Sequence, residues 1–277
     1  MNKNLLIISL LFLFVSADSS YFAKEDVHQD NTNYVLVFSD EFDQPNGSQP
    51  DSKKWRCCIR YVGTGWNRWI SPSPDVAFIK NGHLVCRAIP NPDLRTDTAT
   101  MLTGAIETYG KFSFQYGKVE VRMKTNNKRG NFPAAWMKSE KNDPNRYGEI
   151  DIVEMFGNQG LAQQTIHNHK TTILKKGRAF NVNKRIPLNK WHVYTVEWTP
   201  EKLIFLIDGK VTGEFKKSNN SQDIAEGQWT FDCPFYIRLN QSVGNGNYEC
   251  MIPNTNGIYE TQFDWVRVYQ KKKKVTN

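Results

Sequence analysis

Three carboxylates occupy six residues near the middle of this 277-residue chain: Glu149, Asp151 and Glu154. Ile and Val separate them, and β-branched residues favour an extended backbone, so we expect a strand here. Alternation then places Glu149 and Asp151 on one face and Glu154 on the other. One extra residue, a β-bulge, would return Glu154 to the face of the other two. A solvated strand face is the competing interpretation, but no basic residue alternates with these acids.

Converging carboxylates of this kind can hydrolyse a glycosidic bond. A retaining glycosidase uses one carboxylate as nucleophile and a second as acid/base, about 5 to 5.5 Å apart. Glu149 and Glu154 form the natural pair, and Asp151 can orient Glu149 and help raise the pKa of the acid/base. His167, expected on the next strand, is either a further partner in this cluster or a partly buried structural residue. A hard-cation site is the chemical rival, although three acids on one strand form a line rather than a cage.

Strand patterns that could position these residues recur along residues 34–270, separated by Gly, Asn and Pro. No helical period exceeds about two turns, so the pattern favours an all-β sandwich of antiparallel sheets in one domain. Residues 90–103 are expected to be a polar loop. Alternating or apolar strands are expected at residues 34–38, 76–79, 84–89, 111–114, 118–124, 162–169, 191–198, 203–207, 234–239 and 262–269.

Residues 55–69 are dense in aromatic side chains, with Trp55, Tyr61, Trp66 and Trp69 among loop-forming glycines. In such a loop, aromatic rings either stack on sugars or fill the end of the sandwich. The five cysteines are an odd number, so at least one is free or pairs between molecules. Their spacings match no zinc motif, and small buried hydrophobic residues are an adequate interpretation.

The amino terminus has the pattern of a signal peptide over residues 1–17, with Lys3, an apolar run at 5–15 and a small-residue cleavage site. The run is too short to span a membrane. We therefore expect export, a flexible leader at 18–33, a single domain at 34–270 and a basic tail at 271–277. The net charge is +8, and Lys271 to Lys274 supply half of it. A terminal charge run is usually solvated, so no nucleic-acid partner is inferred, whereas an acidic or sulfated polymer stays open.

The sequence Glu-Ile-Asp-Ile-Val-Glu at residues 149–154 resembles the active-site signature of glycoside hydrolase family 16, in its bulged form. Further ordered matches at residues 39–42, 116–122, 133–137, 239–244 and 264–269 extend the resemblance over nearly the whole mature chain. It implies a concanavalin A-like β-jelly-roll sandwich of two antiparallel sheets with a concave substrate cleft. It also implies retaining, endo-acting hydrolysis with Glu149 as nucleophile, Asp151 as its assistant and Glu154 as acid/base.

The same resemblance implies further site residues. Trp136 would lie beside the scissile sugar, and Trp66 and Asn67 would contact the glycone side. The remaining substrate-binding candidates are His167, Asn240 and Tyr248. Many family members carry a structural calcium on the convex side, and the matching positions here are Glu41, Gly82 and Asp264. No cofactor is required for catalysis.

Two departures from the family pattern concern the substrate rather than the chemistry. Phe132 stands where laminarin-cleaving members usually have Trp, and Tyr248 stands where many have Trp. The leading hypothesis is a secreted endo-β-glycosidase acting on β-1,3- or β-1,3/1,4-glucan. An endo-β-galactosidase acting on galactans or on host mucin-type or keratan-type glycans is the first alternative. The second is a non-catalytic carbohydrate-binding sandwich, against which the intact acids argue. We expect a monomer whose partner is an oligo- or polysaccharide.

Overall fold

The computed structural model describes residues 33–61, 63, 65–141, 143 and 145–272, which belong to one compact unit. The predicted signal peptide and, apart from Asn33, the predicted leader lie outside the described residues. So does the basic tail beyond Lys272. Within the described part of the chain, no helix is both long and apolar enough to cross a membrane.

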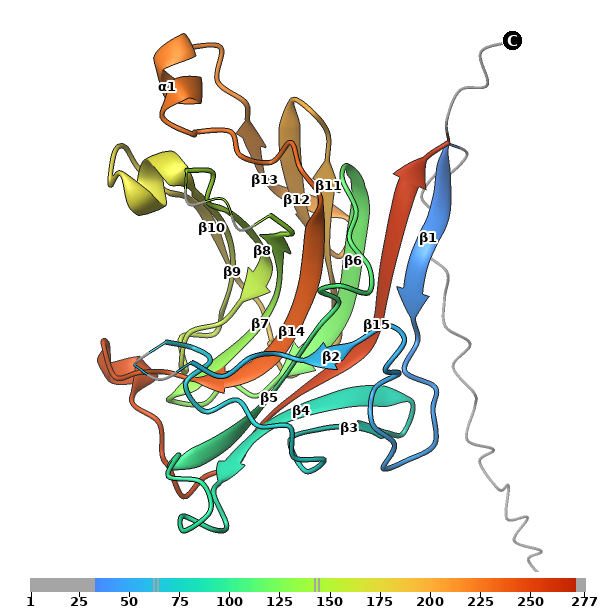
Figure 1. The fold of residues 1–277 in the computed structure, drawn as a ribbon, viewed down its shortest axis with the longest axis vertical. Coiled ribbons are helices and arrows are strands. Elements are labelled where there is room, and N and C mark those ends of the chain that lie inside the picture. The colour runs from blue at the N-terminus through green and yellow to red at the C-terminus, as the bar shows by residue number, and fades with distance from the viewer. Residues whose placement is uncertain (1–32, 62, 64, 142, 144, 273–277) are drawn as a thin grey trace, which may run out of the picture. The chain divides into compact units, whose positions relative to one another are not determined.

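Fifteen strands make up almost all of the regular structure, and they pair antiparallel with one another (Figure 1). Short helical turns lie at His169–Ile173, at α1 (Ser221–Ala225) and at Glu249–Met251. The strands are β1 (Tyr34–Asp40), β2 (Arg56–Cys57), β3 (Ala77–Lys80), β4 (His83–Pro90), β5 (Met101–Glu107), β6 (Gly117–Thr125), β7 (Asn131–Ser139), β8 (Gly148–Glu154), β9 (Leu161–Asn168), β10 (Phe180–Arg185), β11 (His192–Trp198), β12 (Lys202–Ile207), β13 (Lys210–Lys216), β14 (Phe235–Val243) and β15 (Tyr259–Lys271).

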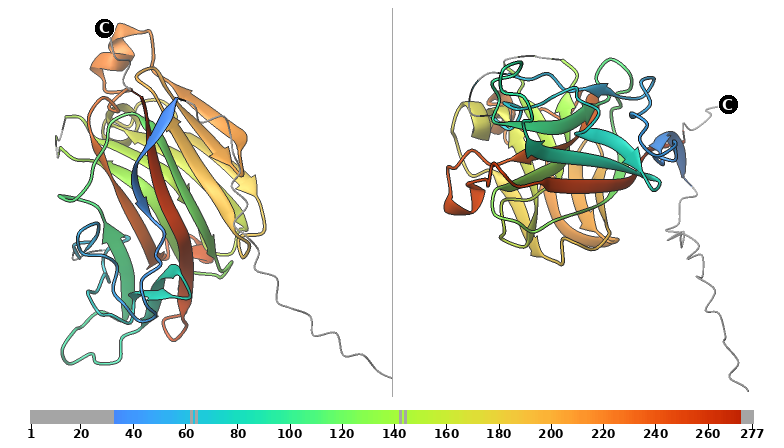
Figure 2. Two further views of the ribbon diagram at one scale, coloured as in Figure 1. Left: turned by 90° about the vertical axis from the view of Figure 1, so that its right-hand side faces the viewer. Right: turned by 90° about the horizontal axis from the view of Figure 1, so that it is seen from below.

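The strands form two layers that are continuous through β5 (Figure 2). One layer has the order β10-β9-β8-β7-β14-β5, and the other has the order β4-β15-β6-β11-β12-β13. The first half of β5 pairs with β4, whereas residues 104–107 pair with β14. Gly104 lies at this transition, where a Cβ atom would come within 1.8 Å of the Val76 carbonyl oxygen. The predicted jelly-roll sandwich is confirmed, with one strand shared by its two layers.

A single large hydrophobic core fills the space between the layers. From β8 it receives Ile150, Ile152 and Val153, each fully buried. From β6 in the opposite layer it receives Val119 and Val121. Since strand side chains alternate, burying the apolar residues of β8 turns its acidic residues to the outer face of the layer.

The sequence prediction is wrong about one strand of this layer. Residues 111–114 form no strand, and only Phe114 makes an isolated bridge, to Phe235. The strand is instead β5, which begins within the predicted polar loop at 90–103. Every residue of β5 is buried, so it has no alternation of polar and apolar residues from which to recognise it. Elsewhere, Lys80 and His83 pair across a two-residue turn, and all five cysteines are free.

Replacing Gly104 by Ala should destabilise the fold, because the new methyl group would meet the Val76 backbone rather than a movable side chain. We expect a loss of at least about 2 kcal/mol in the free energy of unfolding, measured by urea denaturation. Gly213→Ala is the matched comparison, since its methyl group would meet the side chains of Val182 and Phe180, which can rotate away. Equal urea midpoints for Gly104→Ala and the parent protein would contradict the close approach.

Candidate active site

A β-bulge in β8 aligns the three carboxylates. Against β9, Asp151 pairs with Thr165 and Glu154 pairs with Gln163, so three steps along β8 match two along β9. The register against β7 shifts at the same place. The extra residue returns Glu154 to the face of Asp151, as predicted from the parity of the sequence.

Three cross-strand rows of side chains follow from this register. The side of β7, β8 and β9 that carries them is called the acidic face below. The rows are Lys138–Glu149–His167, Trp136–Asp151–Thr165 and Ala134–Glu154–Gln163. Figure 1 shows these strands side by side in the curved layer.

Glu149 is held by one hydrogen bond and one ion pair. The Tyr147 hydroxyl donates a 2.9 Å hydrogen bond to Glu149 Oε2. The Lys138 ammonium lies 3.6 Å from the same oxygen and 3.1 Å from the centre of the Tyr147 ring. Burial lowers the pKa of Lys138 to about 8, although the Glu149 charge opposes the shift. Both contacts fix the carboxylate in one orientation.

Asp151 and His167 form a close pair beside Glu149. His167 Nε2 lies 3.3 Å from Asp151 Oδ2 and 3.9 Å from Glu149 Oε1. Burial alone would lower the pKa of His167, but the adjacent Asp151 outweighs it and raises this pKa to about 9. Burial raises the pKa of Asp151 to about 6, with His167 opposing. The sequence prediction that His167 joins the cluster is therefore confirmed.

The same three residues hold the donor atoms of a conceivable metal site. One ligand atom each from Glu149, Asp151 and His167 lies within 4.8 Å of the others. In the arrangement described, Asp151 raises the pKa of His167, which favours an ion pair between these two residues. The metal rival considered from the sequence was a site of the three carboxylates, whereas the group brought together here has His167 in place of Glu154.

Glu154 differs sharply from Glu149 in its surroundings. Its carboxyl group is 8% exposed and accepts hydrogen bonds from Thr165 Oγ1 at 2.9 Å and from Gln163 Nε2 at 3.2 Å. Burial and then the charge of Asp151 raise the pKa of Glu154 to about 8. A carboxyl group that keeps its proton at neutral pH and a carboxylate paired with cations thus share one face, a combination suited to acid/base and nucleophilic chemistry.

Four of the predicted substrate-binding residues come together here or beside it: Trp66, Trp136, His167 and Asn240. Trp136, opposite Asp151, donates a 2.9 Å hydrogen bond from Nε1 to Asn240 Oδ1. Trp66 packs edge-on against Trp136, with ring centres 5.1 Å apart. Asn240 therefore positions the Trp136 ring, a role that the sequence did not specify.

Within the described part of the chain, neither Asn67 nor Tyr248 makes a hydrogen bond to one of the three carboxylates. The Asn67 side chain donates to the Ile59 carbonyl within its own loop, and Tyr248 is 71% exposed on the segment after β14. Arg68 donates to the carbonyl oxygens of Val243 and Gly244, so residues 65–70 pack against the end of β14. The roles assigned to Asn67 and Tyr248 stay predictions.

The expected calcium ligands do not fit a cation as they are arranged. Arg267 donates to both carboxylate oxygens of Glu41, at 2.9 and 3.0 Å. Asp264 is paired with Arg122 and lies 3.1 Å from His83 Nδ1. Gly82 takes the positive φ of the β3–β4 turn, which explains a glycine there without a metal. A calcium ion would have to displace arginines from both carboxylates.

Sequence reasoning missed several residues of the acidic face, although the alternation offered a signal for them. Tyr147 precedes Glu149 by two residues and Lys138 follows Trp136 by two, which is the spacing of a shared strand face. Gln163 and Thr165 share the parity of His167 in the same way. Arg238 shares the parity of Asn240 in the same way. Glu107 left no such signal, because only the fold pairs its strand with β14.

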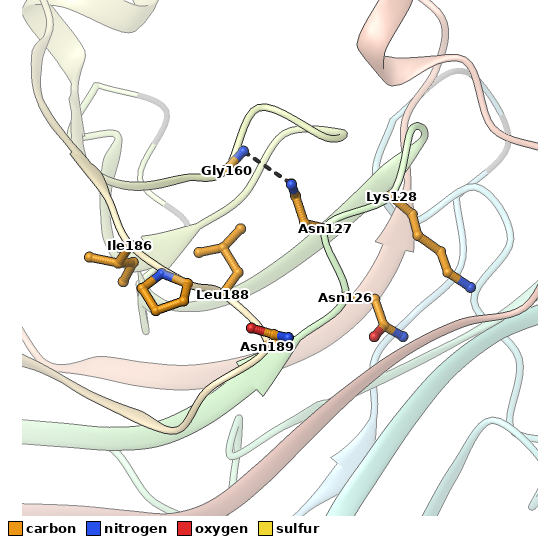
Figure 3. Close-up of a pocket in the computed structure, with 8 residues that line it drawn as sticks. Asn126, Asn127, Lys128, Gly160, Ile186, Leu188 and Asn189 are labelled. Atoms are coloured by element: carbon orange, nitrogen blue, oxygen red, sulfur yellow. Dashed lines mark hydrogen bonds between the residues drawn. The ribbon is translucent and has the colours of Figure 1, made fainter.

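A cavity of about 420 Å³ lies elsewhere, at the turns after β6 and before β11. Figure 3 shows Asn127 and Gly160 facing each other beside it, joined by a 3.0 Å hydrogen bond. None of the predicted site residues lines this cavity. The acidic face is thus distinct from it.

Comparison with known proteins agrees with the geometry. The family profile described as glycosyl hydrolases family 16 matches residues 77–266. The chain is 33% identical to a keratan-sulfate endo-1,4-β-galactosidase of Sphingobacterium multivorum, covering 86% of this chain and 56% of that protein. It is 30% identical to a β-glucanase of Rhodothermus marinus, covering 86% of each. Among solved structures, SCLam, a non-specific endo-β-1,3(4)-glucanase, superposes with a TM-score of 0.76 at 28% identity, covering 87% of this chain and 92% of that one.

The raised pKa of Glu154 predicts a pH-dependent cost to stability. A carboxyl group with a raised folded-state pKa stabilises the fold below its unfolded pKa, and this contribution is lost as the pH rises through about 8. Glu154→Gln should therefore raise the melting temperature relative to the parent at pH 9, by roughly 2–4 °C per kcal/mol, and much less at pH 5.

The control is Glu214→Gln on β13, because ion pairs with Lys202 and Lys216 lower the pKa of Glu214. Its effect should not grow between pH 5 and pH 9. Thermal unfolding followed by circular dichroism measures both variants. A Glu154→Gln effect that stays constant over this range would show that the carboxyl group titrates normally.

Proposed function

We propose that this chain, which belongs to glycosyl hydrolase family 16, hydrolyses internal β-linkages of a glycan with retention of anomeric configuration. The three similar proteins described above are endo-acting glycosidases or a β-glucanase, and this chain is an enzyme of that class. The observation that supports the reaction best is the contrast between Glu149 and Glu154 on one face. Glycosidases of this kind need no cofactor for catalysis.

In the first step, Glu149 attacks the anomeric carbon while Glu154 gives its proton to the leaving oxygen. Tyr147 and Lys138 hold Glu149 in one orientation for this attack. The buried surroundings of Glu154 support its role as acid, because they keep it protonated near neutral pH.

In the second step, Glu154 removes a proton from water, which releases the sugar from Glu149. Asp151 and His167 lie beside the nucleophile throughout. Asp151 offsets much of the His167 charge, and the Lys138 ammonium, 3.6 Å from Glu149 Oε2, is the cation that stabilises the Glu149 carboxylate when the ester breaks. Intact donors around both glutamates argue against a sandwich that only binds carbohydrate.

A galactose-containing glycan is the substrate that we place first. The 33% identity to a keratan-sulfate endo-β-galactosidase supports it. Phe132 also supports it, because laminarin-cleaving members usually have Trp there, and Tyr248 is a second departure, at a position where many members have Trp. A β-1,3- or β-1,3/1,4-glucan, the leading expectation from the sequence, becomes the second candidate. The similarity to SCLam and to the Rhodothermus marinus β-glucanase supports that alternative.

Export is part of the proposal, because polymeric glycans are met outside the cell. Its support is the signal-peptide pattern of residues 1–17, which precedes the described structure. We propose that the mature enzyme acts as a monomer.

Glu149→Ala should lower kcat by about 10⁴-fold or more, because the nucleophile is lost, while glycan binding stays measurable. Proton NMR of the parent reaction should show the β-anomer of the product first. Glu120→Ala is the matched control, since Glu120 pairs with Lys118 in the opposite layer. Full activity of Glu149→Ala, or initial release of the α-anomer, would refute the assigned mechanism.

The substrate proposal is tested by a product profile against laminarin, barley β-glucan, agarose-type galactans and mucin-type glycans. We expect oligosaccharides with galactose at the new reducing end and little cleavage of either glucan. Mass spectrometry of permethylated products identifies them. Rapid cleavage of laminarin with no release from the galactose-containing glycans would establish the second candidate instead.

A further inference from the structure

A row of charged residues extends the acidic face beyond Trp136. In the register of the layer, Trp136 of β7 is opposite Arg238 of β14, which is opposite Glu107 of β5, which is opposite Arg56 of β2. All of them lie on the same face as Asp151. Because neighbouring strands are roughly 4.8 Å apart, Arg238 lies about 10 Å from the Asp151 position. It is thus placed beside the sugars that flank the cleaved bond.

Glu107 anchors both arginines. It is 1% exposed, and its Oε1 accepts hydrogen bonds from Arg56 Nε and Nη2 at 2.9 and 2.7 Å. Its Oε2 accepts a hydrogen bond from Arg238 Nε, at 2.7 Å. Two guanidinium groups share one carboxylate, so this end of the face keeps one positive charge. Among the described residues, none accepts a hydrogen bond from the two terminal nitrogens of Arg238.

Aromatic rings fix the direction of the Arg238 guanidinium group. Its central carbon lies 4.7 Å from the Trp136 ring centre, 5.0 Å from that of Tyr236 and 5.6 Å from that of Trp66. The side chain is 19% exposed, which leaves it reachable from outside. Stacking and the Nε hydrogen bond together hold the terminal N–H groups as a fixed fork, the geometry that suits oxyanions with two acceptor oxygens.

A purely structural role accounts for only part of this arrangement. Arg56 alone already gives Glu107 two charge-assisted hydrogen bonds. Arg238 adds a second cation to a pair that needed only one. A neutral polysaccharide does not need a fixed positive charge here for binding, because uncharged donors can hydrogen-bond to its hydroxyl groups equally well.

We propose that Arg238, anchored by Glu107 and caged by Trp66, Trp136 and Tyr236, binds an oxyanion substituent, a sulfate ester or a carboxylate, on a sugar next to the cleaved bond. This inference rests on the proposed glycosidase function and narrows its substrate to a glycan that carries such groups. The positive net charge of the chain favours the approach of the same polymers.

The test compares kcat/KM on two matched substrate pairs. One pair is keratan sulfate before and after chemical desulfation, and the other is sialylated mucin-type O-glycan before and after sialidase treatment. The parent enzyme should prefer the charged member of one pair, and that pair identifies the oxyanion. Arg238→Gln should lower the preference by about tenfold, as expected when a charge-assisted hydrogen-bond pair is lost. Arg238→Lys should keep part of it, because the charge remains.

Arg122→Gln is the matched control. Like Arg238, Arg122 pairs with a buried carboxylate, that of Asp264, which is 1% exposed. The Arg122 guanidinium group also lies over a tryptophan ring, that of Trp191, but this pair is in the opposite layer. Arg122→Gln should leave the preference for the charged substrate unchanged. The melting temperatures of all variants are measured to check that each variant is folded. A parent enzyme that cleaves any glycan yet shows no charge preference overturns the oxyanion site alone. So does a preference that survives Arg238→Gln, whereas absence of all glycosidase activity overturns the proposed function itself.

Discussion

Mutual repulsion among the carboxyl groups of the acidic face is the constraint that its neighbours must satisfy. Glu149, Asp151 and Glu154 lie on one strand, and the last two are buried, so like charges raise the cost of ionisation there. Residues on the neighbouring strands reduce this repulsion in two ways. His167 and Lys138 bring positive charge beside Glu149 and Asp151. Burial and the charge of Asp151 raise the pKa of Glu154, so Glu154 keeps its proton even though the Thr165 hydroxyl donates to it. The different surroundings of Glu149 and Glu154 thus give two identical side chains different chemical roles.

The hydrophobic core determines where those surroundings can be built. Ile150, Ile152 and Val153 are all buried in the core. A regular strand would point the adjacent residues Ile152 and Val153 to opposite faces and could not bury both in the same core. The bulge resolves the conflict and at the same time turns Glu154 outward with the others. Core packing and catalytic alignment are therefore satisfied by the same backbone irregularity, so neither can be changed without the other.

Much of the fold and the heart of the site could be predicted from local sequence. Alternation located β6, β9 and β11, and the parity of the acids located the bulge. Local patterns failed where the fold brings distant segments together. β5 has no alternation because both of its faces are buried. Only strand pairing brings Glu107 to Arg238, 131 residues away. The calcium expectation stays a prediction. Local sequence could not show that arginines pair with Glu41 and Asp264, since these arginines are distant in sequence or on another strand.

Because β5 belongs to both layers, neither layer can assemble as an independent folding unit. Its second half pairs with β14, and the Trp136–Asn240 hydrogen bond spans 104 residues. Contacts of such long sequence separation require loops to close before any stabilisation is gained, which makes folding slow. The hairpin of β8 and β9 can form early and present all three carboxyl groups. Asn240, which positions Trp136, lies in the last quarter of the chain and joins the site only later. The onset of activity during refolding therefore reports completion of the whole domain.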